Sequence, residues 1–340
     1  MIIGGLDMRP CKPVLAGAQK NRVPNNDAKL ECGQTQGNYT WKQQQGGSMA
    51  QLNIGNFTID CVVDLERPFL HAQTFFPDLT DDMFAHCRRV LPKGDLTPDG
   101  KLQMRFQSFL LKTGQHTILI DTCCGNGKHR PGRDDFDHLN TDYIGALARA
   151  GVKPEQVDFV MCTHLHWDHV GWNTKLLDGK WVPTFPNARY IVGRTEYDYW
   201  NARFQSGDKG IHLISFEDSV LPVIRDGRAV VVDDNHELLK GIWLEPCFGH
   251  SRGHVLINLE SNGVRGLASG DVIHHRIQLA FPEMSTIADT DRALARVNRT
   301  ALIERLADSP TILVPAHFPP PVFGRLVRSE RGFAYAPMAG

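Results

Sequence analysis

Short apolar runs, separated by polar segments with turn residues, recur along most of the chain. Runs that are rich in β-branched or large apolar residues and bounded by Gly, Pro, Asn or Asp are typical of strands. A Gly55-Asn56 pair divides the first run and predicts a turn, and Thr113-Gly114-Gln115 predicts a hairpin. The predicted strands lie within residues 52–63, 106–111, 117–121, 157–162, 188–192, 229–232, 242–246, 254–259, 264–268 and 311–314.

Apolar residues at helical spacing appear between these runs. Thr80 precedes two aspartates and predicts a helix cap, and Thr290 does the same for a helix within residues 289–308. Further helices are predicted within residues 140–151 and from Thr195 through Trp200. Strands and helices alternate in two halves, which favours an α/β fold whose sheets are covered by helices.

The first 48 residues differ from the remainder. They are polar and lack periodicity, so no packed element is predicted there. We expect either a disordered arm or a chain start assigned too early, with Met49 as the native start. Residues 49–340 are then expected to form one domain.

Composition narrows the class of protein. The 340 residues carry 37 Lys and Arg against 38 Asp and Glu, and this balance argues against a dedicated nucleic-acid-binding protein. No apolar run is long enough to span a bilayer, and the first residues lack the core of a secretory signal. The eight cysteines include several within apolar runs, which predicts buried thiols in a reducing, cytoplasmic compartment.

The candidate chemistry is concentrated in residues 163–169, directly after the apolar run 157–162. This segment contains His164, His166, Asp168 and His169 within six positions. His164 and His166 stand two apart, so on an extended backbone they project to the same side. If a helix follows, Asp168 and His169 move to a neighbouring position, and one segment can supply ligands to two adjacent metal ions.

Three later fragments place ligand-type residues immediately after predicted strands. They are the turn from Phe248 to His254, which contains His250, then Asp271 and His317. Together with His-x-His-x-Asp-His and the Asp121-Thr122 turn, they resemble the metallo-β-lactamase superfamily from about Leu52 to Gly324. The resemblance is best to the group with methyl parathion hydrolase, chlorothalonil hydrolytic dehalogenase and acyl-homoserine lactonases. It implies an αββα sandwich of two mixed sheets flanked by helices.

The resemblance also implies a ligand set for two zinc ions, although iron, manganese or cobalt are compatible with the same N and O donors. One ion would take His164, His166 and His250. The second would take Asp168, His169 and His317, with Asp271 bridging. Two positions depart from the family pattern, because Arg252 replaces a proline and Cys123 replaces a glycine. Five further residues are candidates for contacts behind the ligands or for the substrate pocket, namely Asp121, His254, Trp172, Asn173 and His274.

The function implied is hydrolysis of a small, fairly apolar ester, lactone or related electrophile. A hydroxide held by two metal ions would attack, and Asp168 would orient it and receive its proton. One alternative is a mononuclear iron-dependent oxidoreductase resembling the superfamily's persulfide dioxygenases. Nucleic-acid cleavage and metal binding without activity are disfavoured, by the neutral composition and by the intact ligand set. The expected partner is a small molecule, neither nucleic acid nor a membrane; the oligomeric state stays open, with a homodimer as one option.

Overall fold

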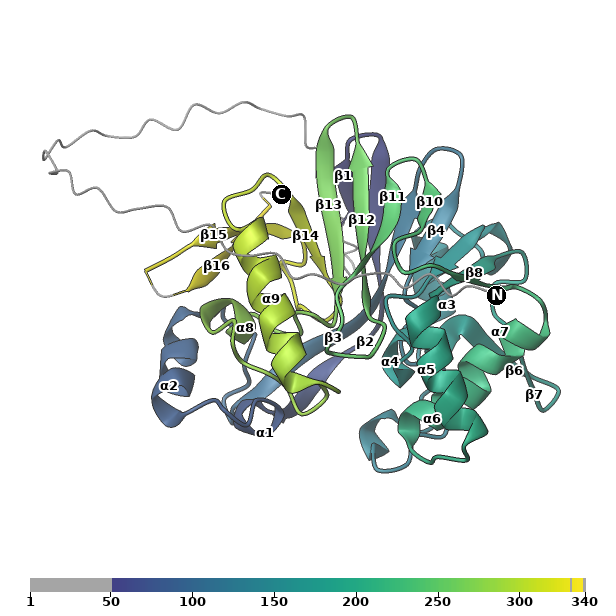
Figure 1. Ribbon diagram of the computed structural model, residues 1–340, viewed down its shortest axis with the longest axis horizontal. Helices are drawn as coiled ribbons and strands as arrows, with labels where there is room; N and C mark the ends of the chain where they lie inside the picture. The colour runs from purple at the N-terminus through teal and green to yellow at the C-terminus, as the bar shows by residue number, and fades with distance from the viewer. Residues whose placement is uncertain (1–50, 331, 339–340) are drawn as a thin grey trace, which may run out of the picture. The chain divides into compact units, whose positions relative to one another are not determined.

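The computed structural model describes residues 51–330 and 332–338, so the prediction for residues 1–48 lies outside the described part of the chain. In this part, two seven-stranded mixed sheets pack face to face with helices on their outer sides (Figure 1). The expected αββα sandwich is confirmed. The first sheet has the order β1 (Gln51–Ile54), β2 (Phe57–His71), β3 (Lys101–Lys112), β4 (Thr117–Ile120), β5 (Phe159–Met161), β8 (Arg189–Gly193) and β9 (Ala229–Val232).

In the second sheet, strands that are consecutive in the sequence are also neighbours in the sheet. Its pairs are antiparallel except β13 with β14, whereas β4, β5, β8 and β9 of the first sheet are mutually parallel. The second sheet consists of β10 (Glu237–Leu239), β11 (Ile242–Pro246), β12 (Val255–Ser261), β13 (Val264–Gly270), β14 (Ile312–Pro315), β15 (Gly324–Arg328) and β16 (Phe333–Pro337). A separate hairpin pairs β6 (Thr174–Leu177) with β7 (Lys180–Pro183).

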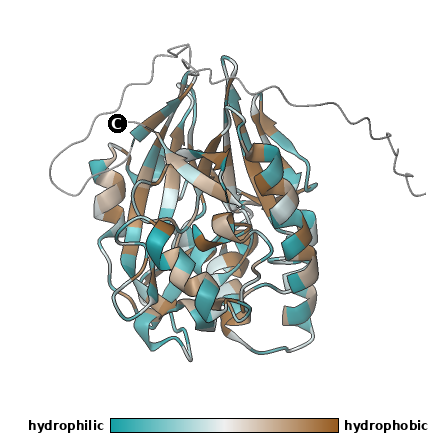
Figure 2. Ribbon diagram, turned by 90° about the vertical axis from the view of Figure 1, so that its left-hand side faces the viewer, coloured by the Kyte–Doolittle hydropathy of each residue, from teal (hydrophilic) through white to brown (hydrophobic). Residues whose placement is uncertain are grey.

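The central core lies between the two sheets. Ile59 and Ile118 of the first sheet and Ile257 and Val314 of the second belong to one buried cluster. Figure 2 shows apolar strand segments facing each other inside the sandwich. Full burial of such a side chain contributes about 1.5–3 kcal/mol, so this layer holds the sheets together and fixes the strand ends at one edge.

Helices cover the outer faces and one edge of the sandwich. Short α4 (Trp167–Val170) follows β5, and α9 packs Leu302, Ile303 and Leu306 into a cluster with Leu267 and Leu313 of the second sheet. Helix α9 spans Arg292–Leu306, and the other helices are α1 (Ala72–Phe75), α2 (Asp81–Val90), α3 (Tyr143–Arg149), α5 (Arg194–Gln205), α6 (Ile211–Ser215), α7 (Leu221–Arg225) and α8 (Ile277–Ala280). Among the described residues, none of these helices has the length and apolar content needed to cross a bilayer.

Two helix caps illustrate how well local sequence predicts helix starts. Thr80 caps α2 as predicted, because its hydroxyl accepts the Met83 N–H at 3.3 Å. The cap predicted at Thr290 is wrong, since the Asp291 carboxylate accepts the Leu294 N–H at 3.0 Å and the helix begins one residue later. The Thr290 N–H instead donates to the His250 carbonyl, which ties the start of α9 to the turn that carries this histidine.

Some elements are absent from the prediction. α6 and α7 are five residues each and are joined by a π-helical turn over Phe216–Val220, so no long periodic stretch marks them. The β6–β7 hairpin and the β15–β16 pair were also not predicted. The predicted buried cysteines are confirmed, because all six cysteines of the described residues are free and buried.

Candidate metal centre

The segment after β5 is held by its neighbours in the parallel part of the first sheet. Asp121, which follows β4, accepts both the backbone N–H and the hydroxyl of Thr163 at 2.8 Å. His166 has an extended backbone, with φ −69° and ψ 157°, and α4 starts at the next residue. The chain thus changes from extended to helical directly after His166, which was the condition for the two-cluster arrangement, and it presents Asp168 and His169 beside the first two imidazoles.

The seven predicted ligands come together as two adjoining clusters. His164, His166 and His250 form one, and the second contains Asp168, His169, Asp271 and His317; within each, the ligand atoms lie within 4.8 Å of one another. Four segments that are far apart in sequence supply them, and all emerge at one edge of the sandwich.

Asp271 lies between the two clusters. Its Oδ2 is 3.3 Å from His250 Nε2 and 3.8 Å from His164 Nε2. Its Oδ1 is 3.1 Å from His169 Nε2 and 3.0 Å from His317 Nε2. One carboxylate oxygen therefore faces each cluster, which is the placement needed to bridge two cations.

The donor set fits metal ions better than it fits protein hydrogen bonds. His164 Nε2 and Asp271 Oδ1 are buried without a hydrogen-bond partner, and His317 Nε2 faces His169 Nε2 at 3.3 Å. Leaving a buried polar atom unpaired costs about 1–3 kcal/mol. Burial, reinforced by neighbouring imidazoles, holds the pKa of His164 well below its ordinary value, so that ring is neutral and offers a lone pair. Nitrogen and oxygen donors in this number suit zinc or a similar divalent ion.

Each cluster is supported from behind by carboxylates. Asp121 Oδ2 lies 2.9 Å from His169 Nδ1, and Asp289 Oδ1 lies 3.1 Å from His250 Nδ1. Such contacts place the proton on Nδ1 and leave Nε2 free for a metal ion. Burial acts to raise the pKa of Asp289, but the hydrogen bond and charge of His250 outweigh it and lower the pKa to about 2. Asp121 was predicted, whereas Asp289 was missed because nothing in its local sequence sets it apart.

Glu196 is a second supporting residue that sequence reasoning missed. Its Oε1 accepts the Leu165 N–H at 3.0 Å and the Trp200 indole N–H at 2.8 Å. Its Oε2 accepts the Ser251 hydroxyl and the Gly253 N–H, both at 2.8 Å. The buried carboxylate thus joins the two histidine-bearing loops. A Cβ on Gly253 would lie 2.1 Å from the Glu196 nitrogen, so this close approach requires glycine.

Four of the five additional candidates contact the site or its supporting turn in different ways. His254 Nε2 accepts the Asp271 N–H at 3.0 Å, and Asp121 supports His169 as described. His274 Nε2 lies 3.2 Å from Asp271 Oδ2, and its ring lines the cavity above the clusters. Asn173 accepts the Thr122 hydroxyl at 2.9 Å and lies behind the ligands.

Trp172 points into the core and does not line that cavity. Its ring stacks on Tyr143 with centroids 5.1 Å apart, and its indole N–H donates to Asp64 at 3.1 Å. Asn173 likewise faces inward, where its amide lies 3.9 Å from the Cys162 sulfur. Neither side chain is placed to touch a substrate in this cavity, because the chain turns inward after α4.

The two departures from the family pattern leave the ligands untouched. Cys123 has φ 50°, in the left-handed region where a glycine is least strained, so the side chain there costs about 1–2 kcal/mol. Its sulfur is buried and lies 3.3 Å from the Ser108 hydroxyl. Arg252 is exposed and points away from the buried turn that carries it.

The clusters open into a cavity of about 200 Å³. Arg133 and His212 line it and were not among the predicted residues. The His212 ring lies 4.0 Å from that of His166, and burial lowers the pKa of His212 to about 3, so it is uncharged. The apolar part of the wall consists of Phe69, Phe75, Met104, Phe106, Trp167, Ile287 and Ala288.

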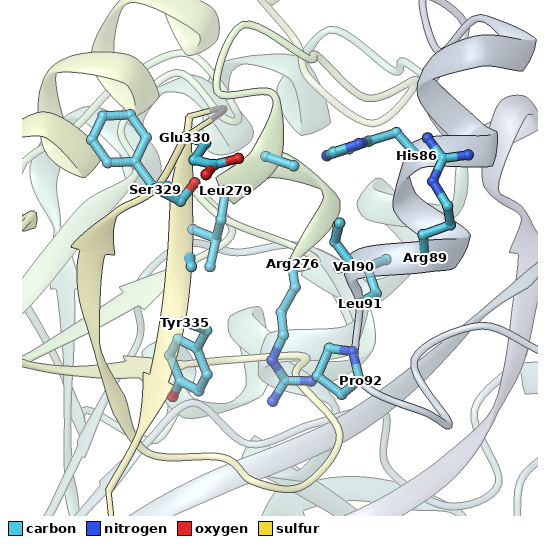
Figure 3. Close-up of a pocket in the computed structure, with 13 residues that line it drawn as sticks. His86, Arg89, Val90, Leu91, Pro92, Arg276, Leu279, Ser329, Glu330 and Tyr335 are labelled. Carbon is cyan, nitrogen blue, oxygen red and sulfur yellow. The ribbon is translucent and has the colours of Figure 1, made fainter.

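A larger cavity of about 530 Å³ lies elsewhere, between α2, α8 and the β15–β16 pair. Figure 3 shows Arg276 reaching between Pro92 and Tyr335 in this cavity. Arg276 is held by Asp95 at 2.6 Å, and none of the seven candidate ligands lines the cavity. The converging imidazoles and carboxylates lie at the smaller cavity instead.

Comparisons with known proteins agree with this geometry. The profile of the Metallo-beta-lactamase superfamily matches residues 107–317. An N-acyl homoserine lactonase of Bacillus cereus is 26% identical over 186 residues, which cover 50% of this chain and 64% of that protein. The chain therefore spans less than two thirds of this relative's length.

Solved structures show the same fold. The hydrolase AbOPH of the beta lactamase superfamily aligns with a TM-score of 0.71 at 23% identity, covering 87% of this chain and 99% of that chain. AidC, a dizinc quorum-quenching lactonase, aligns with a TM-score of 0.69 at 20% identity, covering 86% and 98%.

Proposed function

The chain belongs to the metallo-β-lactamase superfamily, and on this premise we propose that it is a dinuclear metal-dependent hydrolase of small, fairly apolar esters, lactones or related electrophiles. The observation that carries the proposal is the position of Asp271, with one carboxylate oxygen toward each of two ligand clusters beneath an aromatic cavity. His164, His166 and His250 would hold one ion; Asp168, His169 and His317 would hold the other.

The two acidic ligands differ in exposure, and this difference supports different roles. Both side chains line the cavity, but that of Asp271 is 5% exposed and that of Asp168 is 14% exposed. When bound, two zinc-type ions lower the pKa of a coordinated water toward neutrality and polarise the group under attack. Asp168 is the more exposed of the two acidic ligands, so it is the one that would orient the water and accept its proton. Asp271 holds the clusters together.

The cavity wall indicates the kind of substrate. Aromatic side chains on several sides favour an apolar body, and about 200 Å³ admits only a small molecule or one end of a longer one. Arg133 lines the cavity without a carboxylate partner among the described residues and lies over the Phe69 ring at 5.7 Å. A guanidinium in this position suits a carbonyl, carboxylate or phosphoryl oxygen of the substrate.

Lactone hydrolysis is the first activity to test, since the matched relatives are N-acyl homoserine lactonases. Purified, zinc-loaded protein should be assayed against lactones, aryl esters, phosphotriesters and thioesters, with Asp168→Ala as the control. We expect close to two ions per chain by elemental analysis and hydrolysis of at least one class. A stable protein with a single iron ion that oxidises persulfides would overturn the proposal and favour the oxidoreductase.

A further inference from the structure

We propose that His129, Asp137 and His138 form a separate surface site for a divalent transition-metal ion such as zinc, nickel or copper. The three side chains lie in the loop between β4 and α3, outside the buried clusters. Their candidate ligand atoms are within 4.8 Å of one another. Two imidazoles and a carboxylate are the donors that such ions prefer, and the exposed side leaves a position for water.

The geometry places both imidazoles on one carboxylate. His129 Nδ1 lies 3.0 Å from Asp137 Oδ1, and His138 Nδ1 lies 2.9 Å from Asp137 Oδ2. The Asp137 carboxylate is itself fixed, because Oδ1 also accepts the Arg130 N–H at 2.5 Å. That hydrogen bond, joined by those of His138 and His129 and opposed by burial, lowers the pKa of Asp137 to about 2, so the carboxylate is ionised at neutral pH. A cation bound to Nδ1 of both rings and to the carboxylate would take the place of these two imidazole–carboxylate contacts.

The loop backbone brings the histidines together although nine positions separate them. The Gly127 N–H donates to the Leu139 carbonyl at 2.8 Å, and the His138 N–H donates to the Lys128 carbonyl at 2.7 Å. His138 adopts φ 51°, a left-handed turn that histidine tolerates better than most residues. The two arms of the loop are therefore paired at its base, with the histidines on the exposed side.

The same loop forms part of the catalytic cavity wall. Arg133 lines that cavity, and Phe136 packs edge-on against Phe106 and Trp167 with centroids 5.0 and 4.8 Å apart. Trp167 stands between two predicted ligands in the sequence. An ion that closes the base of the loop is therefore expected to stiffen this wall and raise the temperature of the unfolding transition.

Calorimetric titration with Zn²⁺ tests the site directly. Full-length protein already loaded with zinc in the buried clusters is freed of excess metal and titrated again. We expect one additional, weaker equivalent and an increase in melting temperature. His129→Gln/His138→Gln should lower the affinity of this equivalent at least tenfold and keep the tightly bound ions. His116→Gln is the matched control, because His116 is also partly exposed beside a carboxylate, 3.6 Å from Asp158, and belongs to no three-ligand cluster within the described part of the chain.

Asp137→Asn provides a second test that keeps both imidazoles and the hydrogen-bond acceptor for Arg130. It should also weaken the additional equivalent at least tenfold, and it decides the outcome if the double variant fails to fold. The proposal is overturned by the absence of an additional equivalent in the native protein. It is equally overturned by an additional equivalent that persists in these variants, because the ion would then bind elsewhere, for instance at Cys11 or Cys32.

Discussion

At the edge of the sandwich, imidazole nitrogens face one another and a carboxylate, whereas in the loop after β4 buried cations face a buried anion. The first group is the candidate metal centre, in which His317 Nε2 and His169 Nε2 lie 3.3 Å apart. The second group, called the loop cluster below, consists of Lys128 and Arg130 from this loop and Asp218 from the π-helical turn over Phe216–Val220. Arg130 donates to both oxygens of Asp218, at 2.7 and 3.2 Å.

Both groups are buried and both contain charge, but their polar atoms are matched differently. Lys128 donates to the Thr174 hydroxyl at 2.6 Å and the Asp218 carbonyl at 3.1 Å, and it lies over the Trp181 ring at 3.5 Å. The loop cluster is therefore largely satisfied by the protein itself. In the metal centre, imidazole nitrogens and carboxylate oxygens converge, His164 Nε2 and Asp271 Oδ1 have no hydrogen-bond partner, and a cation between them would satisfy both. Both groups are buried, so burial does not distinguish the candidate metal site from the structural ion pair. The difference is that the nitrogen and oxygen lone pairs of the metal centre point toward a common space.

The largest effect is expected at the metal centre. Asp168→Asn should retain more zinc than Asp271→Asn, because only Asp271 faces both clusters. Turnover per bound zinc should nevertheless fall about 100- to 10,000-fold in Asp168→Asn, since general acid–base contributions have this size. Turnover normalised to measured zinc checks this. Near-normal turnover per dinuclear site would show that proton transfer does not depend on Asp168.

A stability effect without metal loss is expected at the loop cluster. Asp218→Asn leaves Lys128 and Arg130 buried without their counter-charge, so the free energy of unfolding should fall by about 3–5 kcal/mol. Urea denaturation and elemental analysis measure the two quantities. The control Asp226→Asn breaks an exposed pair with Arg228 and should cost about 1 kcal/mol or less. Loss of zinc in folded Asp218→Asn would mean that the two clusters are coupled.

The pH dependence of stability should also report on this cluster. Burial, together with the charge of Arg130 and against that of Asp218, lowers the pKa of Lys128 from 10.5 to about 7. Between these values the unfolded chain binds more protons than the folded one, so stability should rise with pH from about 7 to about 10.5. The slope is at most about 1.4 kcal/mol per pH unit. Lys128→Met should remove this rise in urea denaturation at several pH values, and an unchanged slope would contradict the assignment.

The smallest effect is a loss of metal affinity, expected when the carboxylates that hydrogen-bond to the ligand imidazoles are changed. Asp289→Asn and Asp121→Asn each weaken the orientation of one imidazole, so metal affinity should fall about 10- to 100-fold with folding intact. Competition with a chromophoric zinc chelator measures the change. Asp208→Asn, which alters an exposed pair with Arg203, serves as the control. Equal affinity in all three variants would show that Asp121 and Asp289 have no role in holding the ligands.

The amino-acid sequence by itself determined most strands of the two sheets, the helices α2, α3, α5 and α9, and the ligand-type residues that follow strands. Those features are encoded locally, in apolar runs, in spacing such as that of His164 and His166, and in the position of Asp271 and His317 immediately after strands. A resemblance to a known family then supplied the order of the layers and the grouping of the ligands, and the structure agrees with both.

Only the tertiary structure decided which residues support and surround the ligands. Glu196 lies 55 positions before Ser251, and Asp289 lies 39 positions after His250, so no local pattern joins either pair. The same applies to Arg133, which packing brings to the cavity wall. Thr290 and Asp291 are both good caps by residue type, and the contact of the Thr290 N–H with the His250 carbonyl favours the second. Local patterns indicate the periodicity of apolar residues and which side chains of an element are buried. Contacts between segments that are distant in the sequence depend on how the layers pack.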